Sequence, residues 1–230
     1  EAEDERVLRA AQVAVDEGLA HPILIGRPAV IEARLAKAGL RLQLGRDADC
    51  VNPEDDPRFR QYWELYHTLM GRHGVTQEAA KAAVRRSNTT IAALAVKLGH
   101  ADAMLCGMVG RYDVHLQHVR DIIGLRADAP GLAAMNALML ERHALFIADT
   151  YVNEDPSAEQ LASIALMAAQ EVSRFGLPPK VAFLSHSNFG SDDSPSARKM
   201  RAALKEIGQR APELEVEGEM HADAAISETI

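Results

Sequence analysis

The sequence predicts an α/β fold with mostly parallel sheets, and three observations support this prediction. Short apolar stretches alternate with longer segments of helical periodicity, which is typical of strand–helix–strand crossovers. The run ADAMLCGMV at 101–109 is continuously apolar, as expected for a central strand buried on both faces. Several helical segments end at a glycine, for example Gly39 and Gly176, which is a common helix stop signal. We therefore expect helices that pack against the faces of sheets.

The first hundred residues are expected to be mainly helical. Residues 4–18 carry apolar side chains at helical spacing, and HPILIG at 21–26 is typical of a short buried strand. Residues 27–39 return to helical spacing. Residues 56–99 hold further helices, for one of which Thr76 is a candidate N-cap. This order of helix, strand and helix suits crossovers on a parallel sheet.

The second half continues the alternation after the apolar run. Residues 112–125 have helical spacing, and the stretches 132–140 and 143–152 suggest a hairpin with Glu141 and Arg142 between its strands. Four segments then alternate, which are a helix at 156–176, a strand at 180–185, a helix at 194–212 and a strand at 214–225. We find no internal repeat.

Composition and charge exclude several functional classes. The 230 residues carry a formal net charge of -8 without a basic run, so we expect no nucleic-acid partner. No apolar stretch is long enough to cross a bilayer, so we expect no membrane partner. The two cysteines, Cys50 and Cys106, form no metal-binding pair and are typical of reduced thiols in a cytoplasmic protein.

The segment SHSNFGS at 185–191 is the main candidate for a binding site. It follows a predicted strand, and ligands of open parallel sheets bind beyond the carboxyl ends of the strands. A helix with early positive charges begins soon after it, which suits a phosphate or carboxylate group. The candidate anion-binding residues here are Ser185, Ser187, Asn188, Phe189, Gly190, Ser191, Arg198 and Lys199.

The alternative for this segment is a polar turn whose serines satisfy their own backbone. Asp192 and Asp193 favour the alternative, because they would repel an anion unless they point away. A catalytic pair of Ser185 and His186 is disfavoured, since neighbouring residues of a strand face opposite sides.

Several separated segments carry a resemblance to a known family. They are EAEDERVLRAA, RRSNTTIAALAVKLGHADAMLCG, FIADTYVNEDPSAEQLASIA, AFLSHSNFGSDDSPSARKMRAAL and EVEGEMHADAAI. Together they span nearly the whole chain, which resembles the phosphate acetyltransferase/butyryltransferase family. More narrowly, it resembles the C-terminal phosphotransacetylase-like region of bacterial NADP-dependent malic enzymes.

The resemblance implies two α/β domains with an interdomain cleft for acyl-CoA, as in phosphotransacetylase and isocitrate dehydrogenase. We expect the first domain at 1–147, without its first strand and its C-terminal return segment. The second domain is expected at 148–230, incomplete at its C-terminus. The chain starts without methionine inside a helical pattern, so we expect it to be part of a longer protein.

The family's functional residues match this chain only in part. Arg86 lies where the family has a substrate-facing arginine, whereas a second family arginine falls near Gln117, which has no charge. Arg111 or Arg120 would replace it only in a shifted register. The family's later Ser-Arg pair and aspartate would lie beyond Ile230. We add Arg86 and Arg111 to the candidate acetyl-CoA-binding residues and expect no catalytic residue here.

These matches predict a regulatory, acetyl-CoA-binding domain of a malic enzyme, an oxidoreductase that converts malate to pyruvate. NADP and a divalent metal are expected only in the parent's catalytic region. The expected partners are acetyl-CoA or a related acyl-CoA, further copies of the chain in a homo-oligomer, and the N-terminal malic-enzyme domain. The alternatives are an active phosphate acetyltransferase and an oligomerisation module that binds no ligand.

Other polar clusters are weaker candidates. His115 and His118 share a helix face, but a metal pair is less expected than surface or cleft histidines. Glu219, His221 and Asp223 alternate along a predicted strand end, so they could share a face or form a solvated edge.

Overall fold

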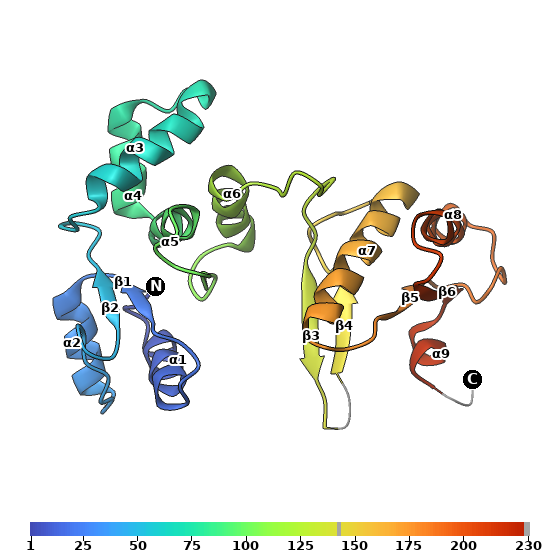
Figure 1. Cartoon of the computed structure of the whole chain (residues 1–230), viewed down its shortest axis with the longest axis horizontal. Coiled ribbons are helices and arrows are strands. Elements are labelled where there is room, and N and C mark those ends of the chain that lie inside the picture. The colour runs from blue at the N-terminus through green and yellow to red at the C-terminus, as the bar shows by residue number, and fades with distance from the viewer. Residues whose placement is uncertain (142–143, 228–230) are drawn as a thin grey trace. The chain divides into compact units, whose positions relative to one another are not determined.

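The computed structural model describes residues 1–141 and 144–227 of the chain. The chain forms two compact units, Glu1–Gly124 and Leu125–Ile230, and each is described by itself (Figure 1). The sequence predicts a domain boundary after residue 147, which differs from the division between these two compact units. That boundary stays a prediction.

The first unit combines helices with one short parallel strand pair. Its elements are α1 (Glu5–Asp16), β1 (Ile23–Ile25), α2 (Pro28–Lys37), β2 (Asp49–Val51), α3 (Phe59–Met70), the 3-10 helix η1 (Gly71–His73), α4 (Gln77–Arg86), α5 (Asn88–Lys97) and α6 (Tyr112–Ile122). Strands β1 and β2 pair in parallel. The predicted helices are confirmed, whereas β2 was not predicted.

The second unit holds a hairpin and a second parallel pair. Its elements are β3 (Met135–Met139), β4 (Ala144–Ala148), α7 (Ala158–Arg174), β5 (Lys180–Leu184), α8 (Pro195–Arg210), β6 (Glu215–Met220) and α9 (Ala222–Ile226). β3 and β4 are antiparallel, and β5 and β6 are parallel. The α/β class and the hairpin are confirmed, while Arg142 of the expected turn lies outside the described residues.

The central strand predicted at 101–109 is wrong, because this segment is irregular in the structure. The Leu105 side chain is 99% exposed, although the prediction required burial on both faces. A central strand needs a paired strand on each side, and the described residues of this unit supply only the β1–β2 pair. Instead, the Glu1 carboxylate accepts hydrogen bonds from the backbone N–H of Gly107 and Met108, at 3.2 and 2.8 Å.

Each unit has its own apolar core. In the first unit Tyr62 of α3 and Leu94 of α5 are fully buried in one cluster, and a second cluster joins α1, α2 and β1. In the second unit α7 and α8 pack together and contact the parallel pair β5–β6 (Figure 1). Ala162, Phe183 and Ile207 are buried in the apolar cluster between these elements. These cores fix the strand ends and helix starts that carry the polar candidates.

Side-chain caps set three helix starts near the polar candidates. Ser87 caps α5 and Ser194 caps α8, and Ser157 forms a capping box with Gln160 at the start of α7. Within the described residues no helix is both long enough and apolar enough to cross a membrane.

Candidate functional site

The β5–α8 loop, residues 185–194, follows the carboxyl end of β5, where the sequence predicts anion binding. Ser187 is completely buried, and its hydroxyl donates to Oε1 of Glu219 at 2.7 Å. The same hydroxyl oxygen accepts from the backbone N–H of Asp192 at 3.1 Å. Ser187 therefore faces the interior of the loop and satisfies groups of the protein itself.

The backbone donors of this loop are also used within the protein. The N–H of Gly190 donates to Oε1 of Glu219 at 2.8 Å, and that of Phe189 to the Glu219 backbone oxygen at 2.8 Å. The N–H of Asn188 donates to the Ser191 hydroxyl at 2.9 Å. This network matches the alternative of a self-satisfied polar turn, and the assignment of these residues to a ligand stays a prediction.

Glu219 and Arg201 form a charged pair beneath the loop, and the sequence analysis did not single out Arg201. Nη1 of Arg201 lies 2.9 Å from Oε1 of Glu219, and Nη2 lies 2.6 Å from Oδ1 of Asp193. Burial alone would raise the pKa of Glu219, but hydrogen bonds from Ser187, Gly190 and Arg201 lower it to about 2. Arg201 follows Arg198 by one helical turn, and that spacing is the signal that could have identified it.

The two predicted cations of α8 each contact a carboxylate. Arg198 pairs with Asp193 at 2.9 Å, and Lys199 pairs with Asp155. In both pairs the aspartate side chain is largely exposed to solvent, so each ion pair contributes little to the stability of the fold. An anionic ligand would have to compete with these carboxylates for the positive charges.

His186 contacts Asp192 and Ser194, and not Ser185. Nε2 of His186 lies 2.9 Å from Oδ2 of Asp192 and 3.2 Å from the Ser194 hydroxyl. In a serine–histidine–aspartate triad the two partners occupy different ring nitrogens, whereas here they share one. Hydrogen bonds from Ser194 and His186 lower the pKa of Asp192 to about 2. This cluster caps α8 and does not form a catalytic triad.

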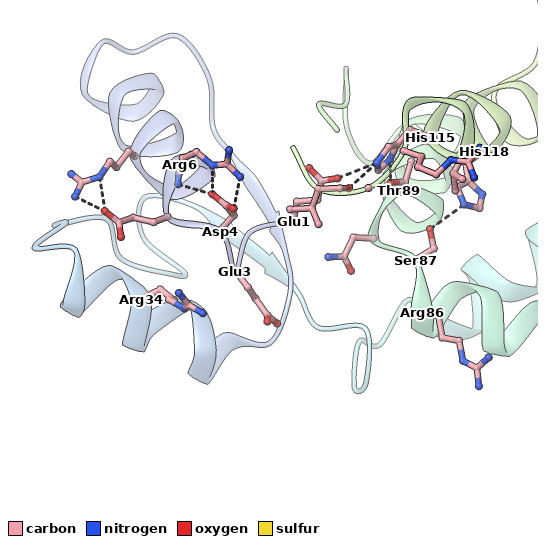
Figure 2. A pocket seen from close by; sticks show the side chains of 17 residues that line it. Glu1, Glu3, Asp4, Arg6, Arg34, Arg86, Ser87, Thr89, His115 and His118 are labelled. Carbon is pink, nitrogen blue, oxygen red and sulfur yellow. Dashed lines mark hydrogen bonds and ion pairs between the residues drawn. The ribbon is translucent and has the colours of Figure 1, made fainter. Parts of the chain in front are cut away.

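The first unit contains a pocket of about 1040 Å³ beside the start of α5, which we call the α5 pocket. Figure 2 shows the side chains that line it, contributed by the N-terminal segment with Glu1, Glu3 and Asp4, by α1, α2, α4, α5 and α6, and by the segment before α6. Arg86 is exposed at its rim and forms no ion pair with any residue in the described parts of the chain. Arg111 is paired with Asp113 at 2.6 Å, and its side chain is 80% exposed. The structure thus brings Arg86 and Arg111 to one pocket.

Two histidines of α6 are held by hydroxyls of α5 and of its N-cap residue in this pocket. Nε2 of His115 lies 2.9 Å from the Val109 carbonyl oxygen, and its Nδ1 lies 2.8 Å from the Thr89 hydroxyl. Because a carbonyl only accepts, Nε2 donates, and in the neutral ring Nδ1 accepts from Thr89. His118 lies between the hydroxyls of Ser87 and Thr90, at 3.4 and 3.3 Å.

Burial lowers the pKa of His118, so its ring is mainly neutral near pH 7. A neutral ring suits the hydroxyl contacts that fix α6 against the start of α5. Within the described residues, no group of three or more His, Cys, Asp or Glu side chains is placed to hold a metal ion.

Comparison with known proteins identifies the family. A family model described as phosphate acetyl/butaryl transferase matches residues 1–230. The chain belongs to this family. The resemblance that the sequence segments indicate is therefore confirmed, over the whole length of the chain.

Malic enzymes are among the similar relatives. An NAD-dependent malic enzyme of Rhizobium meliloti (strain 1021) is 55% identical over 230 residues, covering 100% of this chain and 30% of that protein. An NADP-dependent malic enzyme of Salmonella typhimurium is 54% identical, with the same two coverages. A phosphate acetyltransferase of Synechocystis is 32% identical over 234 residues, covering 100% of this chain and 33% of that protein. The chain spans about a third of the length of these relatives or less.

A solved structure confirms the fold. The phosphotransacetylase from Streptococcus pyogenes matches with a TM-score of 0.83 at 31% identity, covering 100% of this chain and 69% of that chain. The phosphate acetyl/butaryl transferase family and the α/β fold class are thus supported by sequence and by structure.

One position matters for what this family member can do. Gln117 of α6, where the resemblance would place a second cation, donates from its side-chain amide to Asp121 at 2.6 Å. Arg120, the neighbouring cation of α6, is exposed and forms no ion pair with the residues that the structure describes. The chain therefore has a neutral, internally bonded side chain at this position.

Proposed function

We propose that the chain is the acetyl-CoA-binding regulatory phosphotransacetylase-like domain of a malic enzyme and does not itself transfer acetyl groups. The observation that carries this proposal is the contrast among relatives that match the entire chain. Four malic enzymes match at 48–55% identity, whereas a further malic enzyme and three phosphate acetyltransferases match at 30–32%.

The lack of catalysis is supported by the charges of the candidate residues. Transfer of acetyl to phosphate needs cations aimed at the phosphate and at the developing oxyanion. Gln117 offers an amide that is bonded to Asp121, and Arg111 is paired with Asp113. Arg198 and Lys199 are also paired with carboxylates. Loss of one positioning arginine removes several kcal/mol of transition-state stabilisation, roughly 3 kcal/mol by analogy with one oxyanion donor.

Ligand binding is supported by the α5 pocket. Arg86 has no carboxylate partner among the described residues, so its guanidinium is available to a phosphate. The first backbone N–H groups of α5 lie next to it, and the start of a helix favours negative charge. A pocket of about 1040 Å³ is large enough for an extended ligand such as acetyl-CoA.

The proposal extends to the protein that contains this chain. The parent binds NADP and a divalent metal in its N-terminal malic-enzyme region, decarboxylates malate to pyruvate, and is a cytoplasmic homo-oligomer. Acetyl-CoA forms downstream of pyruvate, so its binding slows malate decarboxylation. Such regulation requires that acetyl-CoA bind one arrangement of the assembly better than another.

The regulatory role is tested in the full-length polypeptide that contains this chain, assayed by NADP reduction with malate. We expect acetyl-CoA to slow the reaction, and Arg86→Ala to raise the half-inhibitory concentration roughly tenfold, since a charged hydrogen bond is lost. Arg85→Ala is the matched control, because Arg85 packs its guanidinium 4.6 Å from the Phe59 ring centre and does not line the pocket. An acetyl-CoA concentration series without effect on the wild-type rate would refute the role.

The second candidate is an active phosphate acetyltransferase. It is favoured by the structural match, at a TM-score of 0.83, to a protein named phosphotransacetylase. This candidate predicts sustained release of free coenzyme A thiol when phosphate is added to the chain with acetyl-CoA. An oligomerisation module without ligand predicts neither thiol release nor acetyl-CoA binding.

A further inference from the structure

Ser87 lines the α5 pocket and is also the N-cap residue of α5. Its hydroxyl oxygen accepts a hydrogen bond from the Thr90 backbone N–H at 3.1 Å, which fixes the first turn of the helix. The same oxygen lies 3.4 Å from Nε2 of His118 on α6 (Figure 2). Ser87 is half-buried, so a ligand in the pocket can reach it. What this hydroxyl offers a ligand depends on where its hydrogen points.

The Thr90 hydroxyl determines which ring nitrogen of His118 carries the hydrogen. Thr90 is completely buried, and its hydroxyl lies 3.3 Å from Nδ1 of His118. Among the described residues this hydroxyl has no other hydrogen-bond partner. A buried hydroxyl hydrogen without an acceptor is unfavourable, so Thr90 donates to Nδ1. The ring of His118 is mainly neutral near pH 7, and its one N–H hydrogen therefore lies on Nε2.

With its hydrogen on Nε2, His118 donates to the Ser87 oxygen. A serine hydroxyl has two acceptor positions and one hydrogen. The Thr90 N–H and the His118 Nε2–H occupy the two acceptor positions of Ser87. In the described parts of the chain, no acceptor takes the Ser87 hydroxyl hydrogen. Toward a ligand, Ser87 can therefore act only as a donor.

The neighbouring Thr89 does not have this freedom. Its hydroxyl lies 2.8 Å from Nδ1 of His115, whose Nε2 donates to the Val109 carbonyl oxygen at 2.9 Å. Thr89 therefore donates to His115, and its hydrogen is used within the protein. Of these two adjacent hydroxyls, Ser87 is the one with a hydrogen left for a ligand.

The charges around Ser87 favour an anionic acceptor. Arg86 precedes it, lines the same pocket and forms no ion pair with the described residues. Acidic side chains also line the pocket, but each is engaged within the protein. Glu1 accepts from two backbone N–H groups, and Glu3, Asp4 and Glu5 pair with Arg27, Arg6 and Arg9.

We propose that His118 is a positioning residue that directs the Ser87 hydroxyl hydrogen into the α5 pocket, where Ser87 and Arg86 bind a phosphate group of the acyl-CoA ligand. The inference deepens the proposed acetyl-CoA binding and rests on it. A phosphate suits the site because its oxygens only accept, and a charged acceptor strengthens the hydrogen bonds of a hydroxyl and a guanidinium. All of these residues belong to the first unit.

The orientation of Ser87 is tested in the free wild-type chain by NMR with nitrogen-15-labelled histidine, at a pH where the rings are neutral. The spectrum distinguishes a protonated from an unprotonated ring nitrogen, and His118→Gln identifies the His118 signals by their loss. We expect the hydrogen on Nε2. A hydrogen on Nδ1 would overturn the proposal, because Ser87 would then donate to the ring instead of to a ligand.

The phosphate contact is tested by calorimetric titration with acetyl-CoA and with coenzyme A. Ser87→Ala should weaken binding of both roughly tenfold, since a hydrogen bond to a charged group is lost. Ser87→Thr keeps the hydroxyl and the cap and should retain the affinity. Thr76→Ala is the control for cap loss, because Thr76 caps α4 and does not line the pocket. Its affinity should equal that of the wild type.

The positioning role is tested by a double-mutant cycle with the same ligands. His118→Leu should weaken binding by a smaller factor than Ser87→Ala, because the hydroxyl remains but is no longer oriented. In the Ser87→Ala background it should have no further effect. His118→Gln keeps an N–H donor for Ser87 and should restore most of the affinity lost in His118→Leu.

The outcomes separate this inference from the proposed function. If the wild-type chain does not bind acetyl-CoA, both fall. If it binds and Ser87→Ala keeps full affinity, only the Ser87 contact is refuted. A loss seen with acetyl-CoA but not with coenzyme A would assign Ser87 to the thioester carbonyl and refute the phosphate contact. If the effects of His118→Leu and Ser87→Ala simply add, His118 does not act through Ser87 and its positioning role is refuted.

Discussion

Glu219 is the residue on which the order of the β5–α8 loop depends. Its side chain has no exposed surface, yet it carries a negative charge that is compensated by Ser187, Gly190 and Arg201. Removing one partner of a buried hydrogen-bonded charge costs more than the interaction contributes in water, because the remaining group stays desolvated. The charge state of Glu219 therefore affects the stability of the loop.

The stability of the chain should depend on pH through Glu219. Its pKa falls from 4.5 to about 2 on folding, so the ionised form stabilises the fold above pH 4.5. That contribution is lost as the pH falls through this window. Urea denaturation across the window should show a smaller loss of unfolding free energy in Glu219→Gln than in the wild type. Glu3, Asp4 and Asp192 also have lowered pKa values, so they contribute the same loss of stability at low pH in both proteins. Identical pH profiles for the two proteins would contradict this account.

At the residue scale, the sequence could identify the loop but not the direction of its side chains. The serines, amide and glycine of residues 185–191 mark a polar turn beyond a strand. Ser187 points inward because Glu219, 32 positions later, accepts its hydroxyl, and local patterns do not report such distant pairings. The grouping of Asp223 with Glu219 on one strand face also fails, since β6 ends at Met220 and Asp223 lies in α9.

The helices are determined mainly by local sequence. Apolar spacing predicts α7, and its start is fixed by the capping box of Ser157 and Gln160. Thr76 caps α4, as predicted. The short strand β2 was not predicted, because three residues give too little periodicity. The strand predicted at 101–109 is wrong, because hydrophobicity alone does not show whether a segment has strands to pair with.

The Ser157 cap gives a prediction at the scale of an element. Ser157→Ala should lower the free energy of unfolding by about 1 kcal/mol, because the N–H of Gln160 loses its acceptor. Ser157→Asp keeps a capping oxygen and should retain most of the stability. Urea denaturation at neutral pH measures both changes. A fully stable alanine variant would mean that the cap does not limit the stability of α7.

At the scale of the whole molecule, the family and the fold could be predicted from segments that span the chain. The match to residues 1–230 and the TM-score of 0.83 confirm them. The predicted residues fall in two places, with Arg86 and Arg111 in the α5 pocket and the others in the β5–α8 loop or the first turns of α8. Sequence could not show which charges are already paired, because pairs such as Lys199 with Asp155 form between distant positions. The paired cations are the physical basis for proposing that the domain does not transfer the acetyl group, whereas Arg86, which has no ion pair among the described residues, is the basis for proposing that it binds acetyl-CoA.

Equilibrium dialysis of the chain with acetyl-CoA labelled in the acetyl group, in the presence of phosphate, tests this central claim most directly. The account predicts that label is retained by the protein and is recovered as intact acetyl-CoA. Retention should fall in Arg86→Ala and persist in Arg85→Ala. Recovery of the label as acetyl phosphate would establish catalysis, and absence of retained label would exclude binding; either result would contradict the account.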